Sequence, residues 1–154
     1  MIKFNSVFKG YPGTKDILQN ISFEIDSGEL VFVTGSSGAG KSTLLKLISA
    51  IESPSAGEII FDNQNLSDLR TGDMPYLRRK FGMIFQDHKL LFDRTCFENV
   101  ALPLAINDTT SVDISRRVRA ALNKVGLLEK EKLIPITLSG GEQQRLAIAR
   151  AIVS

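Results

Sequence analysis

The sequence has no tryptophan and only one cysteine among its 154 residues. Cys96 therefore has no partner for an internal disulfide bond, which is typical of proteins from a reducing compartment. Long apolar runs are missing too: the longest, residues 100–106, contains Pro103 and has seven residues, whereas a membrane-spanning helix needs about 20. The N-terminal segment also lacks the apolar region of a secretory signal peptide. These absences predict a soluble, cytoplasmic chain.

A strong excess of one charge is absent as well. The 19 Lys and Arg residues and 17 Asp and Glu residues leave a net charge of +2, so composition gives no case for binding nucleic acid or acidic lipid. Hydrophobic residues make up 43% of the chain and charged residues 23%, close to average globular usage. This balance excludes a disordered or fibrous protein, and the length corresponds to about one domain.

The first half of the sequence alternates between strand and helix patterns. Residues 21–25 alternate apolar with polar side chains, as in a half-buried strand. Residues 30–33 are a continuous apolar run that predicts a strand buried on both faces, followed by a Gly- and Ser-rich loop. Apolar residues at helical spacing then predict a helix over 41–51. Two further strands are predicted at 58–61 and 83–85.

The second half of the sequence is dominated by helix signals. Capping boxes, in which a Ser or Thr precedes a Glu by three residues, occur at 95–98 and 139–142. Ser111 is predicted to cap a helix that continues to Lys124, with Gly126 as its stop signal. The patterns together predict an α/β fold with a helical insertion.

The glycine-rich loop has the pattern of a phosphate-binding loop. Residues 35–42 read Gly-Ser-Ser-Gly-Ala-Gly-Lys-Ser and match G-x-x-x-x-G-K-[ST]. Glycines let backbone N–H groups curl toward a phosphate, and the following helix points its positive N-terminal end at the same anion. Lys41 is placed to reach the β- and γ-phosphates, and the Ser42 hydroxyl is placed to bind Mg²⁺. The predicted nucleotide-binding residues of this loop are Gly35, Ser36, Ser37, Gly38, Ala39, Gly40, Lys41, Ser42 and Thr43.

This loop alone leaves several reaction classes open. GTPases usually add an N-K-x-D motif, but residues 123–126 read Asn-Lys-Val-Gly, with a glycine where the aspartate is needed. A small-molecule kinase does not account for the second motif of the chain.

That second motif, Leu-Ser-Gly-Gly-Glu-Gln at residues 138–143, resembles the signature of ATP-binding-cassette (ABC) ATPases. Ser139 is predicted to cap a helix whose first N–H groups Gly140 and Gly141 leave open to an anion. The resemblance implies that Ser139, Gly140, Gly141 and Glu142 complete the ATP site of a second subunit. It therefore implies a head-to-tail homodimer that encloses two ATP molecules.

Two further positions carry roles that the resemblance implies. Tyr11 lies 24 residues before Gly35, where ABC ATPases place an aromatic ring that stacks on adenine. Gln86 ends the predicted strand 83–85, where the family has a glutamine that approaches Mg²⁺ and the attacking water. The resemblance implies that Lys41 and Gln86 are catalytic residues. It also implies that Ser42 and Gln86 are ligands of Mg²⁺. A tyrosine at a strand edge and a surface glutamine are the alternatives.

One family element is not found in these residues. ABC ATPases have a Walker B strand, which is an apolar run followed by Asp-Glu. It supplies a Mg²⁺ ligand and the residue that polarises water. In this sequence no apolar run is followed by Asp-Glu. The resemblance thus implies a partial ABC domain over 1–154, a P-loop NTPase core with an antiparallel β-rich N-terminal part. We expect a nucleotide-binding part at 1–86, a helical subdomain at 87–138 and the signature helix at 139–154.

Two expectations follow from that reading. The 154-residue chain should hydrolyse ATP poorly, because hydrolysis also needs placement of the metal and water. The strand at 30–33 should lack a neighbour in its sheet. The alternative is a stand-alone ATP-binding module that never hydrolyses ATP.

The residues around Gln86 are similar to one branch of the family, the cell-division ABC ATPases. The similarity is carried by residues 83–95, 98–101 and 135–145. It implies a peripheral protein at the cytoplasmic face of the inner membrane, at the division septum. It also implies an integral membrane partner with four spans that activates cell-wall hydrolases, and contacts with other division proteins. ATPases of lipoprotein-release and macrolide-export systems are the alternatives.

Overall fold

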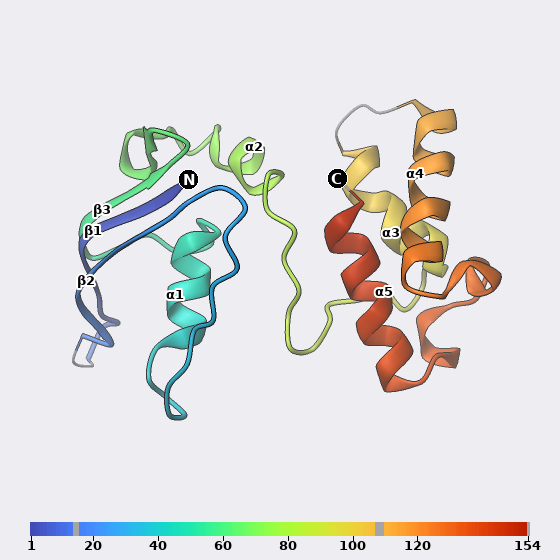
Figure 1. Ribbon diagram of the computed structural model, residues 1–154, viewed down its shortest axis with the longest axis horizontal. Helices are drawn as coiled ribbons and strands as arrows, with labels where there is room; N and C mark the ends of the chain where they lie inside the picture. The colour runs from blue at the N-terminus through green and yellow to red at the C-terminus, as the bar shows by residue number, and fades with distance from the viewer. Residues whose placement is uncertain (14–15, 107–109, 154) are drawn as a thin grey trace. The chain divides into compact units, whose positions relative to one another are not determined.

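The computed structural model describes residues 1–13, 16–106 and 110–153 (Figure 1). The chain divides into two compact units, Met1–Arg78 and Arg79–Ser154, and each is described by itself. The functional division expected from the sequence, with boundaries at residues 86 and 138, stays a prediction.

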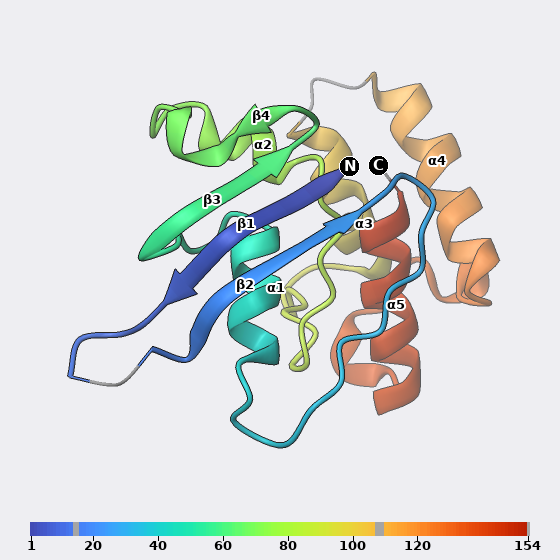
Figure 2. The ribbon, with the colours of Figure 1, turned by 60° about the vertical axis from the view of Figure 1, so that its left-hand side comes forward.

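The first unit contains a four-stranded antiparallel sheet in the order β2-β1-β3-β4 (Figure 2). Its strands are β1 (Ile2–Lys9), β2 (Leu18–Ile25), β3 (Ala56–Phe61) and the short β4 (Gln64–Asn65). The register places Phe4 of β1 opposite Phe23 of β2 and opposite Ile59 of β3. The antiparallel β-rich N-terminal part predicted from the sequence is therefore confirmed.

Helix α1 (Lys41–Ile48) packs its apolar face against this sheet. Leu47 of the helix is fully buried, and the rings of Phe4 and Phe23 stack with 4.5 Å between their centroids. The helix ends earlier than the predicted residue 51: the Ser49 hydroxyl donates to the Leu45 carbonyl, and Ala50 takes a positive φ of 53°. The buried core of the unit is Phe4, Val7, Leu18, Leu47 and Ile59. The short helix α2 (Met74–Arg78) closes the unit.

The second unit is a bundle of helices α3 (Cys96–Ala105), α4 (Ser111–Lys124) and α5 (Gly140–Ile152) (Figure 1). Both predicted capping boxes are present, because Thr95 with Glu98 and Ser139 with Glu142 each make both reciprocal bonds. The three helices enclose one apolar core, formed by Leu90, Cys96, Val100, Leu104, Val118, Ala121, Leu122, Leu127, Leu138, Leu146, Ala147, Ala149 and Val153.

The predicted cap of α4 is wrong by one residue. Thr110, not Ser111, has the extended backbone of a cap, and its hydroxyl accepts from the Asp113 N–H at 3.4 Å. Ser111 is the first helical residue. Both side chains are of a capping type, so sequence alone could not separate the two positions.

Two predicted strands are also wrong. Residues 30–33 and 83–85 form no strand, and no described strand pairs with either. Leu30 is 82% exposed and Phe32 79%, so the run at 30–33 is not buried on either face. A buried strand requires hydrogen-bonded neighbours, and none of the described residues supplies them here. Because no strand forms at 30–33, the expectation that such a strand lacks a neighbour in its sheet stays untested.

Candidate nucleotide-binding site

The loop before α1 has a backbone that requires glycine at its end. Gly40, the residue that caps α1, has a φ of +88°. A Cβ at this position would lie 2.8 Å from Leu18 Cδ2 and 2.9 Å from Ile17 Cγ2. Gly38 also has a positive φ, of 80°. Only glycine adopts such angles at little cost, so the sequence pattern matches a real backbone demand.

Lys41 folds back over the same loop. Its Nζ donates to the carbonyl oxygens of Gly35 at 2.8 Å and Ser36 at 2.7 Å. A turn bond from the Ala39 N–H to the Ser36 carbonyl, at 3.3 Å, closes the loop beneath it. The loop and the ammonium are thus already together, and a phosphate bound by the loop would lie within reach of this cation.

The N-terminus of α1 has no side-chain cap. The cap residue is glycine, and the first turn carries no acidic residue. The Ser42 side chain is exposed, while Thr43 is buried at 8% exposure. A helix start leaves several N–H groups without an intrahelical acceptor and carries a partial positive charge. Open N–H donors, a flanking ammonium and an exposed hydroxyl form a donor set that fits a polyphosphate with a bound cation.

The start of α5, where the signature lies, is arranged differently. The Ser139 N–H donates to Glu142 Oε2 at 2.9 Å, and the Glu142 N–H donates to the Ser139 hydroxyl oxygen at 3.4 Å. Lys130 holds the other oxygen of the Glu142 carboxylate. Lys130, followed by the Ser139 N–H, lowers the pKa of Glu142 to about 2. Gly140 and Gly141 are exposed in the first turn, as expected, but the cap itself is already satisfied within the chain.

Tyr11 lies beyond the end of β1 and is held by a polar cluster. Its hydroxyl donates to Glu52 Oε2 at 2.7 Å, and the Lys9 Nζ lies 5.2 Å from the ring centroid. The bond from Tyr11, ahead of those from Lys46 and Lys9, lowers the pKa of the Glu52 carboxyl. Sequence reasoning found Tyr11 but missed Glu52, because 41 residues separate them and no motif links them.

Gln86 follows residues 81–85, which have no regular structure, and its side chain is exposed. It belongs to the second unit, as does the signature, whereas Tyr11 and the loop belong to the first. The roles assigned to Gln86, to the signature residues and to Tyr11 stay predictions.

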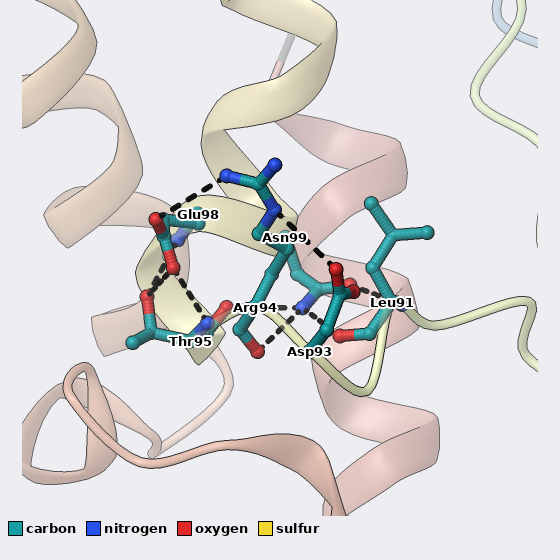
Figure 3. Close-up of polar contacts among 6 residues, drawn as sticks. All are labelled: Leu91, Asp93, Arg94, Thr95, Glu98 and Asn99. Carbon is teal, nitrogen blue, oxygen red and sulfur yellow. Dashed lines mark hydrogen bonds and ion pairs between the residues drawn. The ribbon is translucent and has the colours of Figure 1, made fainter.

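The sequence did not reveal a buried polar residue that follows Gln86 in the same unit. Asn99 of α3 is fully buried, and its amide exchanges hydrogen bonds of 2.9 Å with the backbone N–H and carbonyl of Leu91 (Figure 3). Its Nδ2 also donates to the carbonyls of Arg94 and Thr95 at 3.2 and 3.0 Å. This amide therefore fixes the path of residues 91–95 against α3. Only the structure shows this, because each bond ends on backbone.

No described group of three or more His, Cys, Asp or Glu side chains has the arrangement of a metal site. Among the described residues, no helix combines the length and apolar character needed to cross a bilayer.

The glycine-rich loop, its lysine and the helix that follows define a P-loop fold. The chain belongs to the ABC transporter family, because the sequence model of that family, described as "ABC transporter", matches residues 18–154.

Curated relatives agree with this assignment. The chain is 57% identical over 154 residues to the cell division ATP-binding protein FtsE of Escherichia coli K12; the match covers 100% of this chain and 69% of the relative. It is 49% identical to the FtsE of Haemophilus influenzae, over 99% of this chain and 71% of the relative. It is 42% identical to the methionine import ATP-binding protein MetN 1 of Yersinia pestis, a match that covers 100% of this chain and 46% of the relative.

Solved structures show the same fold. A bacterial ABC transporter cassette solved as a dimer matches 99% of this chain with a TM-score of 0.91 and 37% identity, and 69% of that cassette is covered. The same cassette in a post-hydrolysis state, bound to ADP and Pi, also has a TM-score of 0.91, at 36% identity.

Proposed function

We propose that this chain is the ATP-binding subunit of a membrane-associated ABC complex that acts in bacterial cell division. The observation that supports this most strongly is the loop at 35–40 with the uncapped start of α1, a donor set suited to polyphosphate. The 57% identity to a cell division ATP-binding protein favours this branch of the family over methionine import proteins, two of which are 47% and 42% identical.

The proposed ligand is ATP with Mg²⁺. The N–H groups at the start of α1 and the Lys41 ammonium would hold the phosphates, and the Ser42 hydroxyl would offer an oxygen to Mg²⁺, an ion that prefers oxygen ligands. Tyr11 would stack on adenine, with a contribution of about 1–3 kcal/mol typical of base–aromatic stacking. Gln86 would approach the metal and the water of hydrolysis.

We propose a head-to-tail homodimer in which Ser139, Gly140, Gly141 and Glu142 face the ATP held by the other copy. The solved dimer of a related cassette supports this assembly. The exposure of Gly140 and Gly141 is compatible with it, because an anion could approach these N–H groups closely.

The proposed partner is an integral membrane subunit of the FtsX type, at the cytoplasmic face of the inner membrane near the division septum. Closure of the dimer on ATP would move that subunit, which would activate cell-wall hydrolysis. Support comes from the FtsE relatives and from the residues around Gln86. Co-purification of this chain with an FtsX-type subunit, compared with a methionine-import membrane subunit, would test the choice of partner.

Hydrolysis is proposed to be weak in this 154-residue polypeptide. No apolar run in it is followed by Asp-Glu, and bound phosphate alone does not position a metal and an attacking water. An ATPase rate equal to that of a full-length FtsE would contradict this expectation.

The nucleotide site itself is tested by Lys41→Ala. Loss of the ammonium that lies on the loop should weaken MgATP binding at least tenfold, as measured by calorimetry. Lys124→Ala, in the last turn of α4, is the matched control and should leave the affinity unchanged. Equal affinities of wild type and Lys41→Ala would overturn the proposed site.

A further inference from the structure

A polar cluster joins Tyr11 to the C-terminal end of α1. The Tyr11 hydroxyl donates to Glu52 Oε2 at 2.7 Å, and the Lys9 Nζ lies 3.4 Å from the same carboxylate oxygen. The Lys46 Nζ donates to Glu52 Oε1 at 3.0 Å. Both oxygens of the carboxylate therefore have partners, and one of those partners is the tyrosine.

Glu52 is itself fixed to α1. Its backbone N–H donates to the Lys46 carbonyl at 3.2 Å, in addition to the side-chain bond that Lys46 makes. The side chains of Glu52 and Lys9 are mostly buried, at 21% and 14% exposure. Lys9 is also tied to the Ser53 carbonyl at 2.8 Å. A carboxylate held on several sides offers Tyr11 one defined acceptor.

Tyr11 lies outside any strand or helix, because β1 ends at Lys9. An aromatic platform that must stop moving before a base can stack on it loses affinity to the entropy of ordering. A phenol bonded to a carboxylate makes a charge-assisted bond, which is stronger than a neutral one. The contact with Glu52 would thus restrict the motion of the ring before a ligand binds.

We infer that Glu52 is a positioning residue that orients Tyr11 for stacking on the adenine base. This rests on the proposed role of Tyr11 as the adenine platform. Residues at both ends of α1 then serve the nucleotide site. Lys41 at the start of the helix meets the phosphates, and Glu52, just after its end, holds Tyr11. Glu52 does not touch the nucleotide.

The experiment compares two ligands, MgATP and magnesium tripolyphosphate, by calorimetry on the 154-residue chain. The variants are Glu52→Gln, Tyr11→Phe, their double mutant and Tyr11→Ala. Glu58→Gln is the control, because Glu58 is exposed and lies on β3 of the same unit. Tripolyphosphate has no base, so its affinity reports whether the phosphate loop is still folded.

Glu52→Gln and Tyr11→Phe should each weaken MgATP binding roughly three- to tenfold. The double mutant should bind MgATP no more weakly than the more strongly affected single mutant, because both changes break the same contact. Tripolyphosphate affinity should stay within about twofold of wild type in all of them.

Three results would overturn the inference in distinguishable ways. If Tyr11→Ala weakens MgATP binding but Glu52→Gln behaves like Glu58→Gln, Tyr11 is the platform and Glu52 does not position it. If the effects of Glu52→Gln and Tyr11→Phe add, or tripolyphosphate binding falls equally, Glu52 acts on the fold in general. If Tyr11→Ala leaves MgATP binding unchanged, the proposed platform itself is wrong.

Discussion

Glycines lie at the starts of both α1, which Gly40 caps, and α5, which begins at Gly140, yet the two N-termini are capped differently. The start of α1 has no side-chain cap, and Lys41 leans over the loop in front of it. The start of α5 is closed by the Ser139–Glu142 box, which Lys130 supports. A capped helix start is stable without a ligand, whereas an uncapped one keeps its N–H groups for an anion. The difference supports the proposal that the start of α1 binds the phosphates, whereas the start of α5 has its cap without a ligand.

The largest effect is expected from adding a side chain at Gly40, the residue that caps α1. Gly40→Ala puts a Cβ 2.8 Å from Leu18 Cδ2 at a φ of +88°. We expect a loss of about 1–3 kcal/mol in the free energy of unfolding. MgATP binding should fall more than tenfold, because the loop must shift to relieve the clash. Thermal melts and calorimetry measure the two effects.

Gly72→Ala is the matched control for this change. A Cβ at Gly72 meets nothing within 4 Å, and no positive φ opposes it. Its stability and affinity should match the wild type. Equal behaviour of the two variants would show that the loop needs no glycine at position 40.

A smaller effect is expected from opening the start of α5. Ser139→Ala removes the oxygen that accepts from the Glu142 N–H and should cost about 0.5–2 kcal/mol of stability. Ser111→Ala is its control, because Ser111 is the first helical residue of α4 and not its cap. Denaturant unfolding checks both. MgATP binding by a single chain should not change, and a tenfold loss there would contradict the contrast between the helices.

The same cap gives stability a dependence on pH. The folded pKa of Glu142, about 2, lies below its ordinary value of 4.5. The stabilisation is therefore fully present above about pH 4.5 and is lost as pH falls toward 2. Glu142→Gln should flatten this acid dependence, whereas Glu129→Gln should not. An unchanged acid slope in Glu142→Gln would show that other carboxylates control it.

The features that the sequence predicted well are local ones. The capping boxes at 95–98 and 139–142 need only residues three apart, and both form as expected. The strands at 30–33 and 83–85 failed because a strand depends on neighbours from elsewhere in the chain.

The candidate site divides in the same way. The loop at 35–42 was predicted from a contiguous pattern, and Lys41 indeed lies on it. Glu52 and Asn99 were missed, because their bonds reach across 41 residues to Tyr11 or end on backbone atoms. No spacing rule encodes such contacts.

The most direct test of the contrast between the two helix starts follows backbone amides by NMR while MgATP is added to the dilute chain. The amides of residues 38–43 should shift and gain protection from hydrogen exchange, because phosphate would take their N–H groups. Those of residues 140–143 should stay unchanged until the concentration favours a dimer. Changes confined to 140–143, or none at 38–43, would contradict the assignment of the ligand-binding end to α1.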